Sequence, residues 1–187
     1  MLSRARERIK GLPTLIKDLL DLSKIEAGKM VQYKEPLALQ EVIQKIVDFM
    51  KTDAEKKNID LQFSPSAIPS LICADRSNLE EIFTNLISNA IKYTPEGGKV
   101  WVTLGEEGGF VKATVSDTGI GLKKEDLSRI FDKFYRVKTT ETRQIVGTGL
   151  GLSIVKSIVD AHLGSISVES EEGGGTAFTV LLPKESN

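Results

Sequence analysis

Residues 85–93 read NLISNAIKY and form the centre of a longer helical pattern. Apolar side chains recur here at the spacing of one buried helical stripe: Leu79, Ile82, Phe83, Leu86, Ile87, Ala90 and Ile91. At about 3.6 residues per turn, Asn85, Asn89 and Lys92 lie within about 60° of one another, on the border of this stripe. Amide oxygens suit Mg²⁺ and an ammonium neutralises phosphate, so the stretch predicts a core helix with a candidate magnesium and phosphate site. From this one stretch alone, an amphipathic helix whose Asn and Lys are simply solvated is the preferred interpretation, and other stretches must decide.

The composition describes an ordinary globular chain. Its 187 residues are 40% hydrophobic and 27% charged, with 25 basic and 26 acidic residues, a net charge of -1 and a pI near 6.0. We expect one good core with a small appendage, and no nucleic-acid partner. The single cysteine, Cys73, excludes an internal disulfide and is expected in the core. No apolar run approaches the ~18 residues of a membrane span, and no signal-peptide pattern opens the chain.

The first 30 residues are charged and leucine-rich. Ile9, Leu12, Ile16 and Leu19 follow a 3,4,3 spacing, which predicts a helix that needs a partner helix. Pro13 predicts a kink in this helix, or a helix start near it, because proline removes a helical hydrogen bond.

Downstream, hydrophobic periodicity predicts the main elements. It indicates a helix over 39–57, a strand over 59–63 and a hairpin of two half-buried strands over 100–115. Asp75 or Ser77 can cap the helix that carries NLISNAIKY.

Asp117 follows the hairpin with the parity of its inward-facing residues. An inward carboxylate at a strand end needs a partner, because an unpaired buried charge is costly. Residues 117–121 read DTGIG and surround this carboxylate with flexible backbone. A ligand amine is one suitable partner and a structural turn is the other, and this stretch alone leaves both open.

A second glycine-rich stretch precedes the last predicted helix. Residues 147–152 read GTGLGL and lead into a buried stripe at Ile154, Val155, Ile158 and Val159. Three glycines at the start of a helix leave its free amide hydrogens open to an anion, an arrangement typical of phosphate binding. The stretch lacks the lysine of a P-loop and does not follow a strand, so it indicates neither a P-loop nor a Rossmann unit.

Taken in order, five features resemble the ATP-binding domain of a sensor histidine kinase. They are NLxxNAxKY, DxGxG, FxxF at 131–134, GxGxG and Gly175-Thr176. DLLDLSKIEAG at 18–28 is similar to the second helix of that family's dimerisation and histidine-phosphotransfer domain. The resemblance implies a partial dimerisation and phosphotransfer domain over 1–33 and an ATP-binding catalytic domain over 34–187.

The resemblance also implies roles for single residues. Asn89 would be the main Mg²⁺ ligand, with Asn85 close to the metal. Lys92 would contact phosphate and share the catalytic role with Asn85. Asp117 would accept a hydrogen bond from the adenine amino group, where guanine offers a carbonyl oxygen. Further contacts with ATP would come from Tyr93, Gly119, Ile120, Gly121, Phe134, Arg136, Gly147, Thr148, Gly149, Leu150, Gly151, Leu152 and Thr176.

Residues 132–146 are polar and lead into the glycine stretch, which predicts a mobile lid over ATP. Phe131 and Phe134 would anchor this lid or pack in the core. The family phosphorylates a histidine on the first helix of its dimerisation domain, and we expect that helix to lie outside this chain. The one histidine, His162, falls at a helix C-terminus, where capping or packing explains it better than phosphate acceptance.

These features predict a two-layer α/β (α+β) sandwich, a mixed sheet covered on one face by helices, with an ATP lid and an N-terminal helical stem. The implied function is that of the phosphoryl donor in a two-component protein-histidine kinase, with ATP and Mg²⁺ as cofactors. Implied partners are the phosphoacceptor domain, a response regulator and, in the intact protein, a second copy, whereas the fragment itself could be monomeric. We expect a cytoplasmic location, whether or not the parent protein is anchored to a membrane.

Two alternatives share this fold. One is a non-catalytic nucleotide-binding switch or scaffold that signals through the helical stem. The other is an ATPase similar to gyrase and the mismatch-repair proteins, which usually carry a water-activating glutamate at the position of Asn85. An amide cannot accept a proton at neutral pH, so Asn85 favours the kinase.

Overall fold

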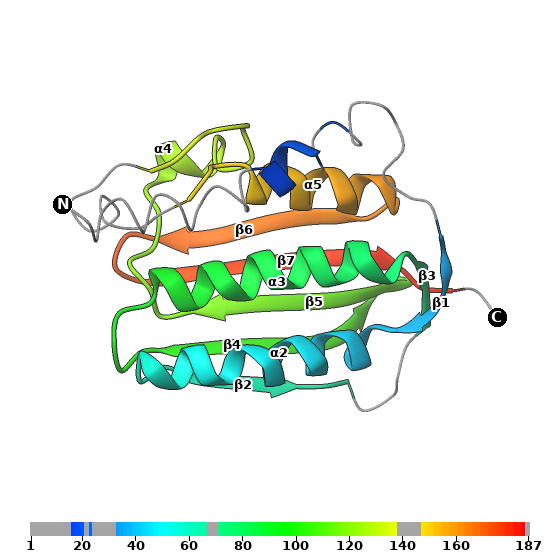
Figure 1. Ribbon diagram of the computed structural model, residues 1–187, viewed down its shortest axis with the longest axis horizontal. Coiled ribbons are helices and arrows are strands. Elements are labelled where there is room, and N and C mark those ends of the chain that lie inside the picture. The colour runs from blue at the N-terminus through cyan, green and yellow to red at the C-terminus, as the bar shows by residue number, and fades with distance from the viewer. Residues whose placement is uncertain (1–15, 21–22, 24–32, 67–70, 138–146, 186–187) are drawn as a thin grey trace.

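The computed structural model describes residues 16–20, 23, 33–66, 71–137 and 147–185. In this part of the chain, helices cover one face of a five-stranded sheet of order β2-β4-β5-β7-β6 (Figure 1). β2 runs parallel to β4, and the other neighbouring strands are antiparallel. The strands are β2 (Asp60–Ser64), β4 (Lys99–Glu107), β5 (Phe110–Asp117), β6 (Ser165–Glu171) and β7 (Gly175–Pro183). The predicted fold class, a mixed sheet with helices on one face, is confirmed.

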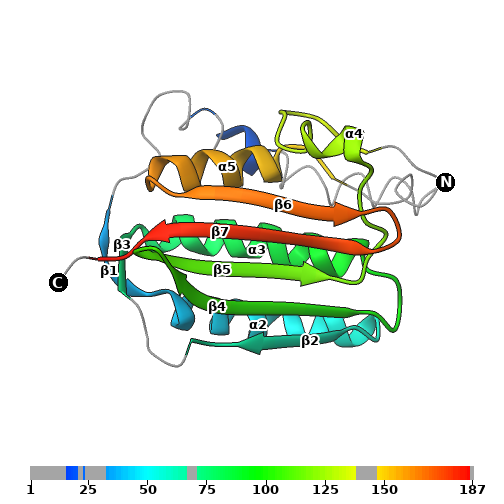
Figure 2. The same cartoon turned by 180° about the vertical axis from the view of Figure 1, so that it is seen from behind.

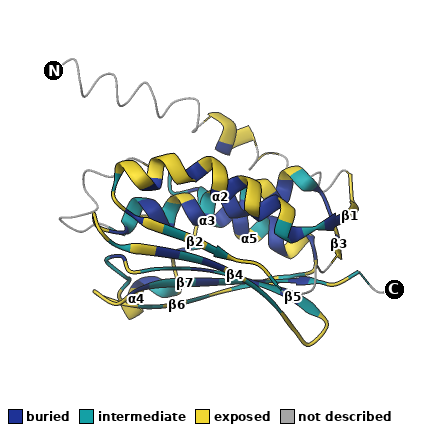
Figure 3. Ribbon diagram, turned by 90° about the horizontal axis from the view of Figure 1, so that it is seen from below, coloured by how far each residue is buried: buried dark blue, intermediate teal, exposed yellow. Residues whose placement is uncertain are grey.

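Three helices form the second layer: α2 (Leu39–Lys56), α3 (Arg76–Tyr93) and α5 (Gly151–Ala161). Each buries the apolar stripe that its periodicity predicts, and the buried residues gather between the helices and the sheet (Figure 3). Seen from behind, the opposite face of the sheet carries no helix among the described elements (Figure 2). The core therefore lies between the two layers.

A small second sheet closes one end of the sandwich. It pairs β1 (Glu35–Ala38) with β3 (Leu71–Ala74) in antiparallel register. Strand alternation turns Ile72 and Ala74 inward, so Cys73 between them is exposed. The prediction that Cys73 lies in the core is wrong, because residues 71–74 form a short strand whose alternation turns Cys73 outward.

Both ends of α3 are capped by side chains. At its start, Asp75 Oδ1 accepts hydrogen bonds from the backbone N–H groups of Ser77 at 2.9 Å and Asn78 at 3.4 Å, so Asp75 is the N-cap. At its end, the Lys57 ammonium donates to the carbonyls of Ile91 at 2.9 Å and Lys92 at 2.8 Å. Lys57 directly follows α2, so these two bonds fix the end of α3 to the end of α2.

His162 connects the end of α5 to the start of α3. Its Nε2 accepts from the backbone N–H of Asp75 at 3.3 Å, and its Nδ1 lies 2.8 Å from the Ile158 carbonyl oxygen. Since Nε2 is an acceptor, the ring is neutral and Nδ1 donates to that carbonyl. Burial lowers the pKa of His162, which favours the same neutral form. With both nitrogens bonded in a buried place, His162 packs at the helix end, as the capping and packing interpretation predicts.

The described part of the predicted stem is helical at residues 16–20. Its Ile16, Leu19 and Leu20 are exposed, as expected of a helix that needs a partner. The rest of the stem prediction lies outside the described residues. Among the helices that are described, none combines the length and the apolar run that a bilayer-spanning helix requires.

We predict that Phe83→Ala lowers the free energy of unfolding by about 3 to 5 kcal/mol, because Phe83 is completely buried in α3 and its removal leaves a cavity. Phe49→Ala is the matched control, since Phe49 is 81% exposed on α2, and it should change stability by less than about 0.5 kcal/mol. Urea denaturation measures both. Equal effects of the two substitutions would contradict the burial of α3.

Candidate functional site

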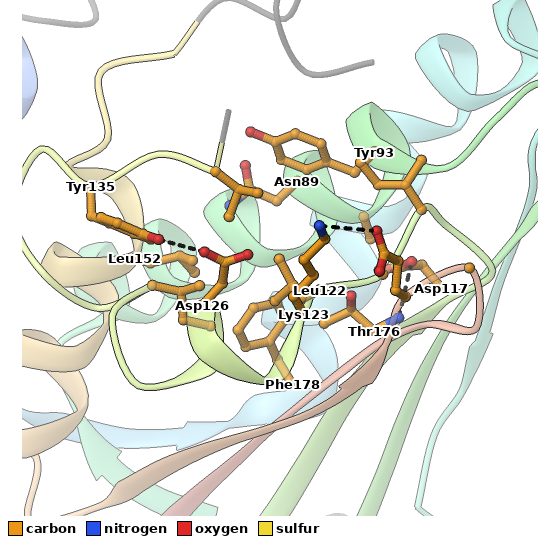
Figure 4. A pocket seen from close by; sticks show the side chains of 17 residues that line it. Asn89, Tyr93, Asp117, Leu122, Lys123, Asp126, Tyr135, Leu152, Thr176 and Phe178 are labelled. Atoms are coloured by element: carbon orange, nitrogen blue, oxygen red, sulfur yellow. Dashed lines mark hydrogen bonds and ion pairs between the residues drawn. The ribbon is translucent and has the colours of Figure 1, made fainter. Parts of the chain in front are cut away.

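A cavity of about 330 Å³ opens between α3 and the adjacent ends of β5 and β7. Asn89 and Tyr93 of α3 lie on one side, and Thr176 and Phe178 of β7 lie on the other (Figure 4). Further walls come from the loop after β5, from α4 (Lys124–Leu127) and from the segment that follows it. The cavity is thus built from elements that are distant in the sequence.

Asp117 stands at one end of this cavity. Its Oδ1 accepts from the backbone N–H groups of Gly119 at 2.7 Å and Thr176 at 3.3 Å. Burial raises the pKa of the Asp117 carboxyl, and these two hydrogen bonds only partly offset the effect. Because both bonds use Oδ1, the second carboxylate oxygen is available to a donor on a ligand. The prediction that Asp117 shares the inward face of its strand is confirmed, because Asp117 lies two residues after the buried Val115 and is itself half-buried.

The loop after Asp117 is attached to the turn between β6 and β7. The backbone N–H of Gly173 donates to the Ile120 carbonyl at 2.8 Å, and that of Leu122 donates to Ser170 Oγ at 2.9 Å. Gly121 has a φ of 66°, and a Cβ there would lie 1.8 Å from the Glu171 carbonyl oxygen. Glycine is therefore required at 121 for close backbone packing as well as for its conformation.

Positive charge gathers near the C-terminal turn of α3. Lys92 Nζ lies 5.4 Å from the centre of the Tyr93 ring. Burial lowers the pKa of Lys92, and the positive charge of Arg136 lowers it further. Lys92 is half-buried and Arg136 is exposed beside it, so an anionic ligand between them would offset both the burial of Lys92 and the repulsion from Arg136.

The glycine stretch faces the polar border of α3. A Cβ at Gly147 would lie 3.1 Å from Lys92 Nζ, and a Cβ at Gly151 would lie 2.6 Å from Asn85 Oδ1. Asn85 Nδ2 donates to the Glu81 carbonyl at 3.0 Å, which directs its Oδ1 toward the start of α5. The start of α5, Asn85 and Lys92 therefore surround one region, as the predicted phosphate site requires.

In the glycine stretch, the side chains of Thr148 and Leu150 already have protein partners. The Leu150 side chain is completely buried in the core, so its contribution to a ligand is limited to its backbone. Thr148 Oγ1 donates to Asp18 Oδ2 at 2.6 Å and accepts from the Leu150 N–H at 3.3 Å. Asp18 belongs to the stem, so the stem contacts the glycine stretch directly.

Phe131 and Phe134, the two predicted lid anchors, behave differently. Phe131 packs edge-on against Phe178, with ring centres 6.4 Å apart and an interplanar angle of 81°. Phe134 has a φ of 63° and is 58% exposed, so it is neither a core residue nor part of the cavity wall. Its anchoring is through the backbone, where its N–H donates to the Gly149 carbonyl at 3.0 Å. Residues 138–146, which form most of the predicted lid, lie outside the described residues.

Residues 74–186 match the family described as histidine kinase-, DNA gyrase B- and HSP90-like ATPase. The chain belongs to this family. A sensor-like histidine kinase of Rhizobium meliloti is 38% identical over 176 residues, which cover 94% of this chain and 34% of that protein. The chain thus spans about a third of the length of this curated relative.

Two solved structures of histidine kinases have the same fold. Full-length ShkA in complex with AMPPNP superposes with a TM-score of 0.85 at 29% identity, covering 99% of this chain and 38% of that one. ThkA in complex with the response regulator TrrA superposes with a TM-score of 0.78 at 29% identity, covering 96% of this chain and 49% of that one. The described architecture is therefore that of the ATP-binding domain of this ATPase family.

The cavity of this ATPase-family domain unites seven of the residues predicted to bind ATP: Asn89, Tyr93, Asp117, Ile120, Gly121, Leu152 and Thr176. The predicted phosphate site lies beside it and brings together Asn85, Lys92, Gly147 and Gly151. Gly119 does not line the cavity, but its backbone N–H donates to Asp117.

Several polar residues of the cavity wall were not predicted from the sequence. Tyr135 follows Phe134 and lines the cavity, where its hydroxyl donates to Asp126 of α4 at 2.5 Å. Glu172 also lines the wall and lies 3.8 Å from the Lys123 ammonium. No local pattern marks these residues, since tertiary contacts alone bring them together.

We predict that Asp117→Asn does not destabilise the ligand-free domain at neutral pH. The folded-state pKa of Asp117 lies above its ordinary value, so the folded state binds this proton more tightly than the unfolded state. The ionised carboxylate therefore costs stability at neutral pH, and this cost vanishes as the pH falls below the unfolded pKa of about 3.9. Urea denaturation of both proteins at several pH values should show that the Asn variant has the higher free energy of unfolding near neutral pH, and that this difference narrows as the pH falls. A widening advantage would contradict the burial argument.

Proposed function

We propose that this chain is the ATP-binding, phosphoryl-donating part of a sensor histidine kinase. One observation carries the proposal: a single cavity has a half-buried carboxylate, Asp117, at one end, and Lys92, Arg136 and a glycine-rich helix start beside it. ATP has the matching chemistry, with an amino group on its base and a chain of negative charges. The similar ShkA structure contains AMPPNP, which supports the same ligand here.

Magnesium fits the donor groups at the phosphate end. Among the described residues, no group of three or more His, Cys, Asp or Glu side chains could hold a metal ion. The cation would therefore be held by phosphate oxygens and by the amide oxygens of Asn89 and Asn85, as Mg²⁺ commonly is. Bound there, it would neutralise charge that develops on the phosphates.

The chain's own residues would act by positioning and by charge neutralisation, without covalent chemistry. Lys92 and Arg136 would bind the phosphates, and the start of α5 would offer its free backbone N–H groups. Asn85 cannot act as a general base, so water near the γ-phosphate would not be activated. The phosphoryl group would then remain available to an imidazole that arrives from another domain.

We propose three partners for the intact protein. The phosphoacceptor would be a histidine of a dimerisation domain, to which residues 1–33 would contribute one helix. A response regulator would receive the phosphate next, by analogy with ThkA, whose structure was solved with one. The third partner would be a second copy of the chain, bound through the exposed apolar side chains of the stem.

A non-catalytic switch of the same fold is the second candidate. The contact between Asp18 of the stem and Thr148 of the glycine stretch favours it, because nucleotide binding could be transmitted through that contact alone. The two candidates differ in one property. A kinase transfers phosphate to histidine, whereas a switch only binds the nucleotide.

We predict that the chain binds ATP more tightly than GTP, and that Asp117→Asn weakens ATP binding by about 1.5 to 3 kcal/mol because a charged hydrogen bond is lost. Calorimetry with Mg²⁺ present measures both effects. Asp60→Asn is the matched control, since Asp60 is exposed on β2 and does not line the cavity. Equal affinities for ATP and GTP would overturn the assignment of Asp117.

The kinase assignment predicts that the chain, given labelled ATP and a separately supplied phosphoacceptor domain, places acid-labile phosphate on that domain's histidine. Lys92→Met should lower the transfer rate by about 10- to 100-fold, because a charged contact with phosphate is removed. Lys99→Met, at an exposed position of β4, is the control. His162→Gln should leave the transfer intact, and label on His162 itself would overturn our interpretation of that residue.

The same assay also separates the kinase from an ATPase. Release of phosphate to water should be slow. Asn85→Glu should raise the rate of this release by up to about 10²- to 10⁴-fold, the gain that a general base provides, provided that Mg²⁺ binding survives. Fast, saturable hydrolysis by the unmodified chain would favour an ATPase, and tight binding without any transfer would favour the switch.

A further inference from the structure

Asp117, Thr176 and Ser170 form one row across three neighbouring strands. Asp117 of β5 pairs directly with Thr176 of β7, and Thr176 pairs directly with Ser170 of β6. Directly opposed residues point their side chains to the same face of a sheet, here the face that the helices cover. Asp117 and Thr176 line the cavity, whereas Ser170 does not. Ser170 therefore lies one strand behind the cavity wall.

The Ser170 hydroxyl has three polar neighbours. It accepts a hydrogen bond from the backbone N–H of Leu122 at 2.9 Å, and it lies 2.7 Å from the Gly175 carbonyl oxygen and 2.9 Å from Thr176 Oγ1. A carbonyl oxygen can only accept, so the single proton of Ser170 must point to Gly175. The contact with Thr176 then requires that Thr176 donates its own proton to Ser170.

We infer that Ser170 is a positioning residue that sets the base specificity of the cavity through the Thr176 hydroxyl. With its proton directed to Ser170, Thr176 presents only lone pairs to a ligand. The neighbouring Asp117 carboxylate is also an acceptor. This end of the cavity is therefore lined by acceptors, which suit the 6-amino group of adenine, or a water that donates, and oppose the 6-oxo group of guanine or hypoxanthine.

This inference rests on the proposed nucleotide binding and assigns part of its specificity to a residue that does not touch the ligand. Without the Ser170 hydroxyl, the Thr176 proton loses its acceptor and can turn toward the cavity. A rotated Thr176 can donate to a 6-oxo group, so discrimination between the two classes of purine should fall. The Leu122 N–H also loses its acceptor, but this affects both classes of nucleotide alike.

The test compares the dissociation constants of ATP and ITP, which carry the same triphosphate and differ at the 6-position and the neighbouring N1 of the base. In Ser170→Ala, we expect the preference for ATP over ITP to fall by about three- to tenfold, the range for one neutral hydrogen bond. Ser170→Thr, which keeps the hydroxyl, should retain the preference. In a Thr176→Val background, which has no rotatable hydroxyl, Ser170→Ala should leave the ratio unchanged, and this double-mutant cycle isolates the coupling.

An unchanged ATP-to-ITP ratio in Ser170→Ala would overturn the inference, even if both affinities fall, because a purely structural role weakens both nucleotides equally. Loss of the preference in Ser170→Thr as well would also overturn it. If the unmodified chain bound neither nucleotide, the proposed function itself would fail. If it preferred ATP and Ser170→Ala kept that preference, only the role of Ser170 would be lost.

Discussion

The burial of the apolar stripe of α3 against the sheet determines where a ligand can bind. Phe83 and its apolar neighbours on α3 leave this helix one orientation, and the N-cap Asp75 and the ammonium of Lys57 hold its two ends. In that orientation Asn89 faces the cavity and Asn85 faces the start of α5. A rotation of the helix by one residue, about 100°, would turn both amides away and expose part of the core.

The two ends of the site carry opposite charges, and burial disfavours the charged form of both Asp117 and Lys92. Burial raises the pKa of Asp117 and lowers that of Lys92, so each charged form costs free energy in the folded protein. These costs are tolerated because the core supplies enough stability elsewhere, a common arrangement at functional sites. A ligand with an amine at one end and phosphates at the other would compensate both costs at once.

Local periodicity was sufficient to predict α2, α3, α5 and the β4–β5 hairpin, because each repeats its buried side chains at a fixed interval. It was not sufficient for β3, whose four residues are too short for a pattern, and so Cys73 was misplaced. Phe134 was predicted to contact ATP and either to anchor the lid or to pack in the core, but its left-handed backbone turns the side chain outward and it does not line the cavity. Tyr135 and Ser170 depend on contacts between segments distant in the sequence, which only the folded structure reveals.

The hydrogen bond from Phe134 N–H to the Gly149 carbonyl joins the two sides of the predicted lid at its base. A Cβ at Gly149 would lie 2.8 Å from the Phe134 carbonyl carbon, so the backbone at 134 and the backbone at 149 can approach this closely only with glycine at 149. The two ends of the intervening segment are therefore held together by described residues, as at the base of a loop. Closing such a loop costs only about 0.6 kcal/mol more for each doubling of its length. The span between residues 134 and 149 can thus lengthen or shorten from one protein to another with little effect on the stability of the sandwich beneath it.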